Sequence, residues 1–265
     1  MKYFQVFKTS WEDGFVYRLN FLMWRVRSVM GLLLVYFLWQ AVFSHSQSVF
    51  GYEKPVMLTY VLGTSVMQAL VLSSRSIDVG GQISTGDLSN YLLKPLDYFR
   101  YWLARDVADK LLNLAFVIIE LGLFIILLKP SLVVPANSGL FLAAIIAAIL
   151  GMVLYFYLSF LVSMTTFWFV EHNGWPTRFL FQVLIEFVAG ALFPLDILPA
   201  AVYALTRFLP TSYLLFFPMQ IWLGRVNFHD VWFGIGIMLA WILTLQFLVK
   251  GVWNRGIRVY EAYGR

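Results

Sequence analysis

LFLAAIIAAILGMVLYFYLSFLVSMTTFWFV, residues 140–170, is a run of 31 residues without a charged side chain. As a helix it would be about 46 Å long at about 1.5 Å per residue, whereas the hydrocarbon core of a bilayer is about 30 Å thick. The run is therefore typical of a transmembrane helix that tilts or projects beyond the membrane. Ala143, Ala147 and Gly151 recur in it every four residues, and such a stripe of small side chains allows another helix to approach closely.

Five further apolar stretches flank this run, so that the chain has six expected spans: 28–43, 56–73, 111–128, 140–170, 178–193 and 231–249. Composition agrees, because 61% of the residues are hydrophobic and only 12% are charged, against about 25% charged in soluble proteins. The remaining residues are too scattered for a separate soluble domain. The sequence predicts an all-α membrane protein whose residues 1–265 form one domain.

The connections between the spans differ sharply in positive charge. Fifteen of the nineteen basic residues lie in the tails and in alternate connections: Lys2, Lys8, Arg18, Arg25, Arg27, Arg75, Lys94, Arg100, Arg105, Lys110, Arg178, Lys250, Arg255, Arg258 and Arg265. The other side holds Lys54, Lys129, Arg207 and Arg225. Basic residues near span ends stay in the cytoplasm, so we expect a multi-pass protein of the inner or plasma membrane with both termini cytoplasmic. The net charge of +5 is then a signal for topology and lipid headgroups, and no nucleic-acid partner is expected.

Residues 1–27 precede the first span, and we do not expect them to be a cleaved signal peptide, because Glu12 and Asp13 stand where a short basic region is expected. Aromatic, basic and apolar residues recur there at helical spacing, namely Trp11, Phe15, Arg18, Leu19 and Leu22. This pattern predicts an amphipathic helix in the cytoplasmic headgroup layer. The alternative is that the leader merely extends the first span.

The longest polar connection, residues 74–110, joins spans two and three. Asp87 is expected to cap a short helix over 88–93, and Pro95 ends it because proline restricts the preceding residue and offers no amide hydrogen. A second amphipathic helix, 98–109, leads into span three. A compact helix in a cytoplasmic loop suits a soluble partner, and the alternative is a solvated connector without one.

Three stretches of the chain resemble a known family. ISTGDLSNYLLKPLDYF (83–99), the YRLNFL lead-in (17–22) and GALFPLDILPAAVYALTRFLPTSYLLFFP (190–218) are similar to the ABC-2 type permeases, most closely to the branch of paired permeases that works beside a separate ATPase. The resemblance implies a dimeric transmembrane domain of an ATP-driven exporter. Its partners would be an ABC ATPase that binds ATP and Mg²⁺, a second permease (itself or a related six-span chain) and membrane lipids.

The resemblance also assigns roles within this chain. Residues 1–27 would hold the elbow helix, and the 74–110 connection would be the coupling loop. The residues that would couple to the ATPase are Gly86, Asp87, Leu88, Asn90, Leu92, Leu93, Lys94 and Pro95. Among them we expect Leu88, Leu92 and Leu93 to form an apolar anchor for the partner, because buried apolar contacts dominate small interfaces.

Several catalytic signatures are absent from the sequence. No G-x-x-x-x-G-K-[ST] loop is present, so the chain has no such cradle for nucleotide phosphates and ATP would bind elsewhere. His45, His172 and His229 lie on different connections, and the chain has no cysteine, so no metal site is expected. With no G-x-S-x-G motif either, we expect a transport subunit without cofactor-binding, metal-binding or catalytic residues of its own.

Polar residues inside spans are costly in hydrocarbon and suggest function. Asn113 and Glu120 lie seven residues apart, almost on one face of span three, and Arg178, Gln182 and Glu186 form a stripe at four-residue spacing on span five. Each set should face a neighbouring helix or an aqueous cavity. Interhelical hydrogen bonding, a place along the export path and proton coupling are the alternatives for them.

Four prolines divide residues 194–230 into pieces too short to cross: Pro194, Pro199, Pro210 and Pro218. Short apolar helices beside prolines predict a re-entrant hairpin near the outer face, and an interfacial loop is the alternative.

The leading function is that of an exporter permease for an amphiphilic or hydrophobic cargo, such as a lipid, glycolipid, glycan or drug-like compound. The alternative is a proton-coupled secondary transporter that uses Glu120 and Glu186. Internal repeats would favour that class, but the two three-span halves do not correspond in length or motif. A membrane-embedded enzyme ranks third, because no catalytic constellation is present.

Overall fold

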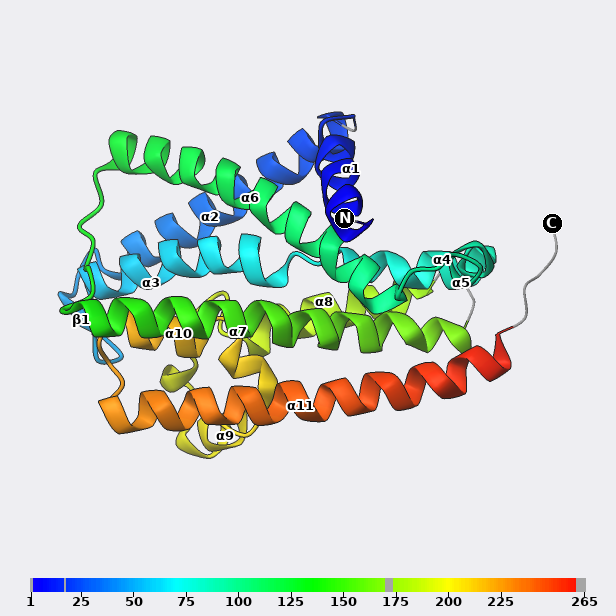
Figure 1. Ribbon diagram of the computed structural model, residues 1–265. Helices are drawn as coiled ribbons and strands as arrows, with labels where there is room; N and C mark the ends of the chain where they lie inside the picture. Colours follow the sequence, from blue (N-terminus) through cyan, green and yellow to red (C-terminus); the bar gives the residue numbers. More distant parts are fainter. Residues whose placement is uncertain (1, 17, 170–173, 261–265) are drawn as a thin grey trace.

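The computed structural model describes residues 2–16, 18–169 and 174–260. It consists almost entirely of helices, and the long ones lie side by side (Figure 1). Among the described residues, five helical segments are long and apolar enough to cross a bilayer. They are Leu22–Val42 of α2 (Arg18–Val42), α3 (Lys54–Met67) with the π-helix η1 (Gln68–Leu72), α6 (Tyr98–Leu128), α7 (Ser138–Ser163) with the 3-10 helix η3 (Met164–Phe167), and α11 (Phe228–Val259). The predicted all-α membrane class is confirmed.

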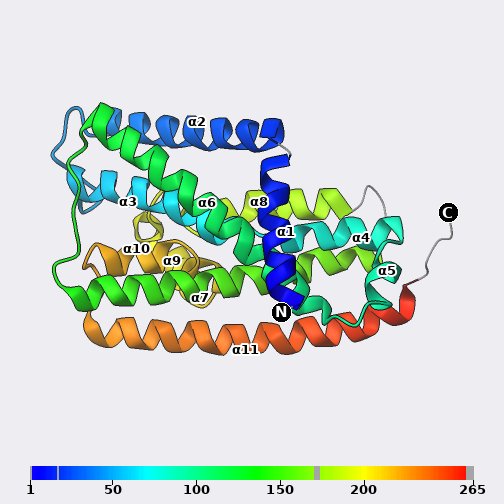
Figure 2. The ribbon, with the colours of Figure 1, turned by 45° about the horizontal axis from the view of Figure 1, so that its top comes forward.

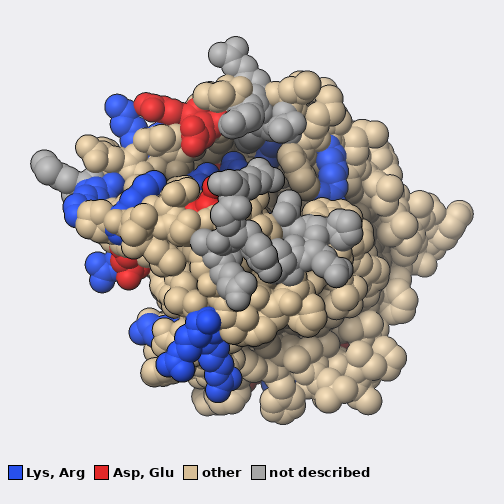
Figure 3. All heavy atoms as spheres, turned by 90° about the vertical axis from the view of Figure 1, so that its right-hand side faces the viewer, with Lys and Arg blue, Asp and Glu red and all other residues tan. Residues whose placement is uncertain are grey.

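The bundle has two distinct ends. The α5 end, on the right of Figure 1, holds α4 (Val79–Thr85), α5 (Leu88–Leu92) and the last turn of α11. The β1 end, on the left, holds the strands β1 (Ser48–Val49) and β2 (Tyr52–Glu53) and the loop between α6 and α7. Figure 3 views the α5 end, where Lys and Arg side chains form several surface groups. Positive side chains are thus present at the end that holds α4 and α5 of the connection 74–110.

The predicted fifth span, 178–193, is shorter in the structure than the sequence suggests. Helix α8 (Trp175–Val188) has 14 residues, which corresponds to about 21 Å and is less than the hydrocarbon thickness. The chain turns at Gly190, whose φ is +81° and where an added Cβ would lie 2.8 Å from the Tyr60 hydroxyl oxygen. Glycine adopts this backbone conformation without strain, so α8 ends before it could cross alone.

The region 194–230 is broken into short helices, as its prolines predict. They are η5 (Leu195–Ile197), α9 (Ala200–Thr206), η6 (Pro210–Tyr213) and α10 (Phe216–Trp222). The segments Ala200–Thr206 and Pro210–Trp222 are bent by 77° at their junction, the geometry of a broken span or a re-entrant loop.

The small-residue stripe on α7 lies against this region. An added Cβ at Gly151 of α7 would lie 3.3 Å from the Leu214 carbonyl oxygen. Gly151 therefore allows a close approach, as predicted, although the segment that approaches is the turn between η6 and α10 and not a helix.

The leader forms a helix of its own, α1 (Lys2–Val16), which runs across α6 and at a steep angle to α2 (Figure 2). Gly14 allows α1 to lie close to α6, because an added Cβ at Gly14 would lie 2.5 Å from a methyl carbon of Leu112. The backbone N–H of Asp97 donates to the Tyr3 hydroxyl over 3.1 Å. The leader is thus not a straight extension of the first span, and its place in the headgroup layer stays a prediction.

The connection 74–110 contains η2 (Arg75–Asp78), α4, α5 and the beginning of α6. The predicted helix 98–109 is the first part of α6 and continues without a break into the third span. At the opposite end, β1 and β2 pair as a hairpin that the sequence analysis did not foresee, with Ser48 opposite Glu53. Its two turn residues, Phe50 and Gly51, both have positive φ, as hairpins with two-residue turns require.

Candidate functional site

The segment 86–95 joins α4 to α6 at the α5 end and contains α5, a helix of five residues (Figure 1). A helix this short is not stable by itself, so its position depends on what holds it. Leu88 is fully buried in a small hydrophobic core that also includes Ile83 and Trp102. Leu88 is therefore a core residue that a partner protein cannot contact. The expected anchor of three leucines was wrong in this respect, and it is reduced to Leu92 and Leu93.

The opposite side of the segment forms an exposed edge, made of Leu92, Leu93, Lys94 and Pro95. Leu92 is 47% exposed and Leu93 is 86% exposed. The Lys94 ammonium lies 4.5 Å from the centre of the Tyr91 ring, within cation–π range. Asp87 and Asn90 are also exposed. Two leucines held on the surface beside a lysine can bind an apolar and acidic groove.

The start of α5 is not capped by Asp87, and this prediction is wrong. The backbone of Asp87 is already helical, whereas a capping residue has extended angles, and its carboxylate instead accepts a 2.7 Å hydrogen bond from the Thr85 hydroxyl. The Tyr260 hydroxyl lies at this turn: it accepts from the Ser89 N–H over 3.3 Å and donates to the Gly86 carbonyl over 2.8 Å. Sequence reasoning missed Tyr260, because it lies 171 residues from Ser89.

Asn113 and Glu120, the polar residues predicted on span three, both meet Arg25 of α2. The Arg25 guanidinium donates to both Glu120 carboxylate oxygens, one of them over 2.6 Å, and to the Asn113 side-chain oxygen over 3.3 Å. The side chain of Arg25 is 9% exposed and that of Glu120 is 25% exposed. The two predicted residues therefore bridge α6 to α2.

This contact continues into a larger Lys110 cluster, which joins α6 to the start of the connection 74–110. Asn113 donates to Asp109 over 3.0 Å, and Asp109 pairs with Arg75 over 2.9 Å. Lys110 pairs with Asp106 over 3.4 Å and also donates to the carbonyls of Leu70, over 2.9 Å, and Ser73 at the end of η1. The members of the cluster are Arg25, Arg75, Asp106, Asp109, Lys110, Asn113 and Glu120.

The spacing of polar residues along α6 is a sequence signal for this cluster. Asp106, Asn113 and Glu120 are seven residues apart, and Asp109 and Lys110 fall between the first two on the same side of a helix. Such a continuous polar face on an otherwise apolar helix indicates buried partners. Arg25 could not be assigned to it from sequence, because nothing in the pattern tells which helix packs there.

The stripe on α8 also faces protein. Gln182 donates to Glu186 over 3.1 Å and accepts from the Tyr155 hydroxyl of α7 over 3.3 Å. The Arg178 guanidinium donates to the Ile77 carbonyl in η2 and to the Gly174 carbonyl. The stripe thus makes hydrogen bonds to the neighbouring elements α7 and η2, which agrees with the alternative of interhelical hydrogen bonding. In the described part of the chain, no hydrogen bond or ion pair joins Gln182 or Glu186 to Asn113 or Glu120.

A second polar group, the Tyr52 cluster, lies at the β1 end and was not predicted. The Tyr52 hydroxyl donates to the Asp196 carboxylate over 2.9 Å and accepts from Gln220 over 2.5 Å. Arg225 lies over the Tyr52 ring, with 3.9 Å to its centre, and pairs with Asp196 over 3.6 Å. Burial raises the pKa of Tyr52 above its usual range, so its hydroxyl stays protonated. The cluster consists of Tyr52, Asp196, Gln220 and Arg225.

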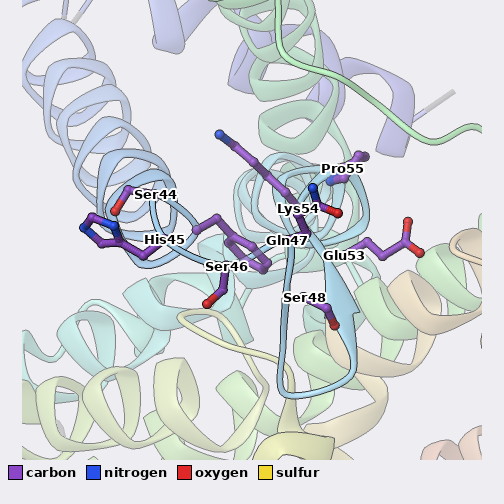
Figure 4. Close-up of a pocket in the computed structure, with 9 residues that line it drawn as sticks. Ser44, His45, Ser46, Gln47, Ser48, Glu53, Lys54 and Pro55 are labelled. Atoms are coloured by element: carbon purple, nitrogen blue, oxygen red, sulfur yellow. The ribbon is translucent and has the colours of Figure 1, made fainter.

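A hollow of about 650 Å³ lies beside the hairpin, lined by residues 43–48 and 53–55. Figure 4 shows that its labelled side chains fan outward, with the charged ends of Glu53 and Lys54 pointing in different directions. They do not converge on one point, so the hollow lacks the arrangement of a ligand site. Among the described residues no three His, Cys, Asp or Glu side chains could hold a metal ion, and His172 lies outside these residues.

Comparison with known families gives one match. A family model described as ABC-2 family transporter protein covers residues 29–264 of the chain. The match includes all five long helices except the first residues of the segment Leu22–Val42. No curated protein matches the chain significantly.

Proposed function

The chain belongs to the ABC-2 family of transporter proteins, and we propose that it is the permease subunit of an ATP-driven exporter whose ATPase is a separate chain. The observation that carries this proposal is the exposed edge of the segment 86–95. Leu93 is 86% exposed although Leu88, five residues earlier, is fully buried. An exposed leucine pair on a segment that is otherwise anchored in a core favours a partner protein.

In this proposal the exposed edge enters a groove of the ATPase, which supplies the ATP and Mg²⁺ chemistry. Leu92 and Leu93 bury apolar surface there, and Lys94 adds a positive charge that suits an acidic rim. Asp87 and Asn90 lie beside the edge as polar contacts. A groove that closes or tilts when the ATPase binds nucleotide would push the segment.

The push would reach the membrane through two rigid connections. Leu88 packs in the same small core as Tyr98 and Phe160, so the segment is packed against α6 and α7. The Lys110 cluster fastens the other end of the connection to α6. Since α6 is one unbroken helix from Tyr98 to Leu128, a displacement at its start is carried along its full length.

We propose that the chain lies in a cell membrane with its α5 end on the cytoplasmic side. Two permease chains, identical or related, would enclose the export path. The α8 stripe is the better candidate to line it, because Glu120 is already bound by Arg25 through both oxygens. Gln182 and Glu186 would offer polar groups to an amphiphilic cargo such as a lipid, glycolipid, glycan or drug-like compound, moved outward.

The alternative of proton-coupled transport receives no specific support. In the described part of the chain Glu120 contacts Arg25 and Glu186 contacts Gln182, and the hydrogen bonds of these two sites form no relay from one to the other. A proton relay needs donors and acceptors in sequence. We therefore retain ATP-driven export.

The test replaces Leu92 and Leu93 together with Asp, which places charge in the proposed apolar contact. We expect the ATPase that copurifies with the wild-type chain to be lost, a weakening of at least a hundredfold in affinity, while membrane insertion and thermal stability are kept. Phe50→Asp is the matched control, because Phe50 is 67% exposed at the other end of the molecule and Asp tolerates its positive φ. Full retention of the ATPase by the double variant would contradict the proposal.

A further inference from the structure

Tyr260 occupies an unusual position at the tip of the segment 86–95. Its hydroxyl donates to the Gly86 carbonyl over 2.8 Å and accepts from the Ser89 N–H over 3.3 Å. Gly86 has a φ of +82° and ends α4, while Ser89 lies in the first turn of α5. The Tyr260 hydroxyl therefore joins the end of α11 to the turn between two short helices, a turn that the Ser89 N–H and hydroxyl also close by donating to the Gly86 carbonyl over 3.2 and 2.7 Å.

The ring that carries this hydroxyl is held firmly by α11 and η3. The Tyr260 ring meets the Phe167 ring edge to face, with 6.1 Å between centres. Gly256 allows the end of α11 to lie close to the same Phe167 ring, because an added Cβ at Gly256 would lie 2.3 Å from that ring. One turn earlier Trp253 stacks on Tyr98 with 4.9 Å between ring centres. The last turns of α11 are thus packed against the small core, and the Tyr260 hydroxyl adds a hydrogen-bonded contact to the turn before α5.

We propose that Tyr260 is a positioning residue that ties the segment 86–95 to α11, so that a push on α5 moves the last span together with α6. The proposal rests on the proposed function, since the push comes from the ATPase. Leu88 is the fully buried residue of α5 and Tyr91 packs against the same core, and helices of five residues have little stability of their own. The two hydrogen bonds of the Tyr260 hydroxyl add a polar link between this turn and the end of α11, so that α5 and the last span move as one unit.

Tyr260→Phe tests this inference, because it removes the hydroxyl and keeps the ring in its aromatic contacts. Tyr157→Phe is the matched control: Tyr157 is half-buried on α7, and no hydrogen bond of its hydroxyl is found among the described residues. Amide hydrogen exchange is measured on the full permease with its copurified ATPase, with and without a non-hydrolysable ATP analogue. Exchange reports local opening in each segment separately.

In the wild type we expect the ATP analogue to change exchange both in 86–93 and in 253–260. In Tyr260→Phe the change in 86–93 should persist while that in 253–260 falls at least threefold, and basal exchange in 86–93 should rise about tenfold. Tyr157→Phe should match the wild type. A merely stabilising tyrosine would not separate the two nucleotide-dependent changes.

The outcomes distinguish this inference from the function on which it rests. If no ATPase copurifies with the wild type, the proposed function fails and this inference falls with it. If the ATPase binds but the analogue leaves 253–260 unchanged in the wild type, or if Tyr260→Phe behaves like the wild type, the tie to α11 is overturned while the exporter proposal stands.

Discussion

The two polar clusters of this protein are built on different principles. The Lys110 cluster consists mainly of ion pairs, and its central pair is deeply placed, because the side chains of Lys110 and Asp106 are 8% and 2% exposed. The Tyr52 cluster is arranged around a neutral hydroxyl, and its ion pair is more accessible, with side-chain exposures of 33% for Arg225 and 24% for Asp196.

The clusters also differ in what they join. The Lys110 cluster connects α2, the end of η1, η2 and α6, and so fixes the beginning of the coupling connection to a long helix. The Tyr52 cluster connects the hairpin to the short helices of 194–230 and to Arg225 before α11. The first lies on the route from the exposed edge to the spans, and the second braces loops at the far end.

This difference leads to unequal consequences of mutation. Removing one member of a buried ion pair leaves an uncompensated charge, which is far more costly than losing a neutral hydrogen bond. Within the Lys110 cluster, the part around Lys110 and Arg75 should therefore govern both stability and ATPase coupling, and the Arg25–Glu120 contact should govern stability. The Tyr52 cluster should contribute modest stability alone. The predictions below test this contrast, beginning with the largest effect.

Lys110→Met should be the most damaging change. It leaves the buried Asp106 carboxylate without its cation and removes the donor to the carbonyls that end η1. We expect a loss of about 3 kcal/mol or more in the free energy of unfolding, measured by denaturant titration in detergent. Adding Asp106→Asn should restore at least half of the loss, since the orphaned charge is gone. A loss below 1 kcal/mol in Lys110→Met would show that the two clusters do not differ as argued.

The Arg25 contact should give an intermediate effect. Arg25→Gln or Glu120→Gln removes charged hydrogen bonds from the partner, and we expect about 2 kcal/mol from each in the same titration. The pair of substitutions together should recover part of this loss and keep the ATPase activity of the complex within twofold of the wild type, because Glu120 bridges helices. If the double variant folds stably but its ATPase activity collapses, Glu120 acts in transport and not only in packing.

The sequence predicted the membrane class, because long uncharged runs have few other stable environments. It also predicted the broken region 194–230 from its prolines and the close contact at Gly151 from the spacing of small residues. These features depend on local chemistry that a single segment carries. The fifth span was predicted too long, since the hydrophobic pattern continues through Gly190 and only the left-handed turn there ends α8.

The candidate site was less accessible to sequence reasoning. The polar residues on α6 could be found by their spacing, but their partner Arg25 lies 95 residues from Glu120. Leu88 looks like its neighbours Leu92 and Leu93 in the sequence, and only the packing of 74–110 separates the buried leucine from the exposed pair. Asp87 matched a capping preference, whereas Ser89 and the distant Tyr260 make the hydrogen bonds at this turn. Contacts between distant segments are set by tertiary packing, and no local pattern encodes them.

Tyr52→Phe should have the smallest effect of the three. It keeps the ring under Arg225 and removes one hydroxyl, and Asp196 retains its ion pair with Arg225. We expect a loss of about 1 kcal/mol in the free energy of unfolding, with ATPase association and ATPase activity unchanged. Tyr203→Phe, on the nearby helix α9, is a suitable control because no hydrogen bond of its hydroxyl is found in the described residues. Impaired ATPase activity in Tyr52→Phe at unchanged stability would instead place the β1 end on the coupling route, and the contrast between the two clusters would then be one of chemistry but not of function.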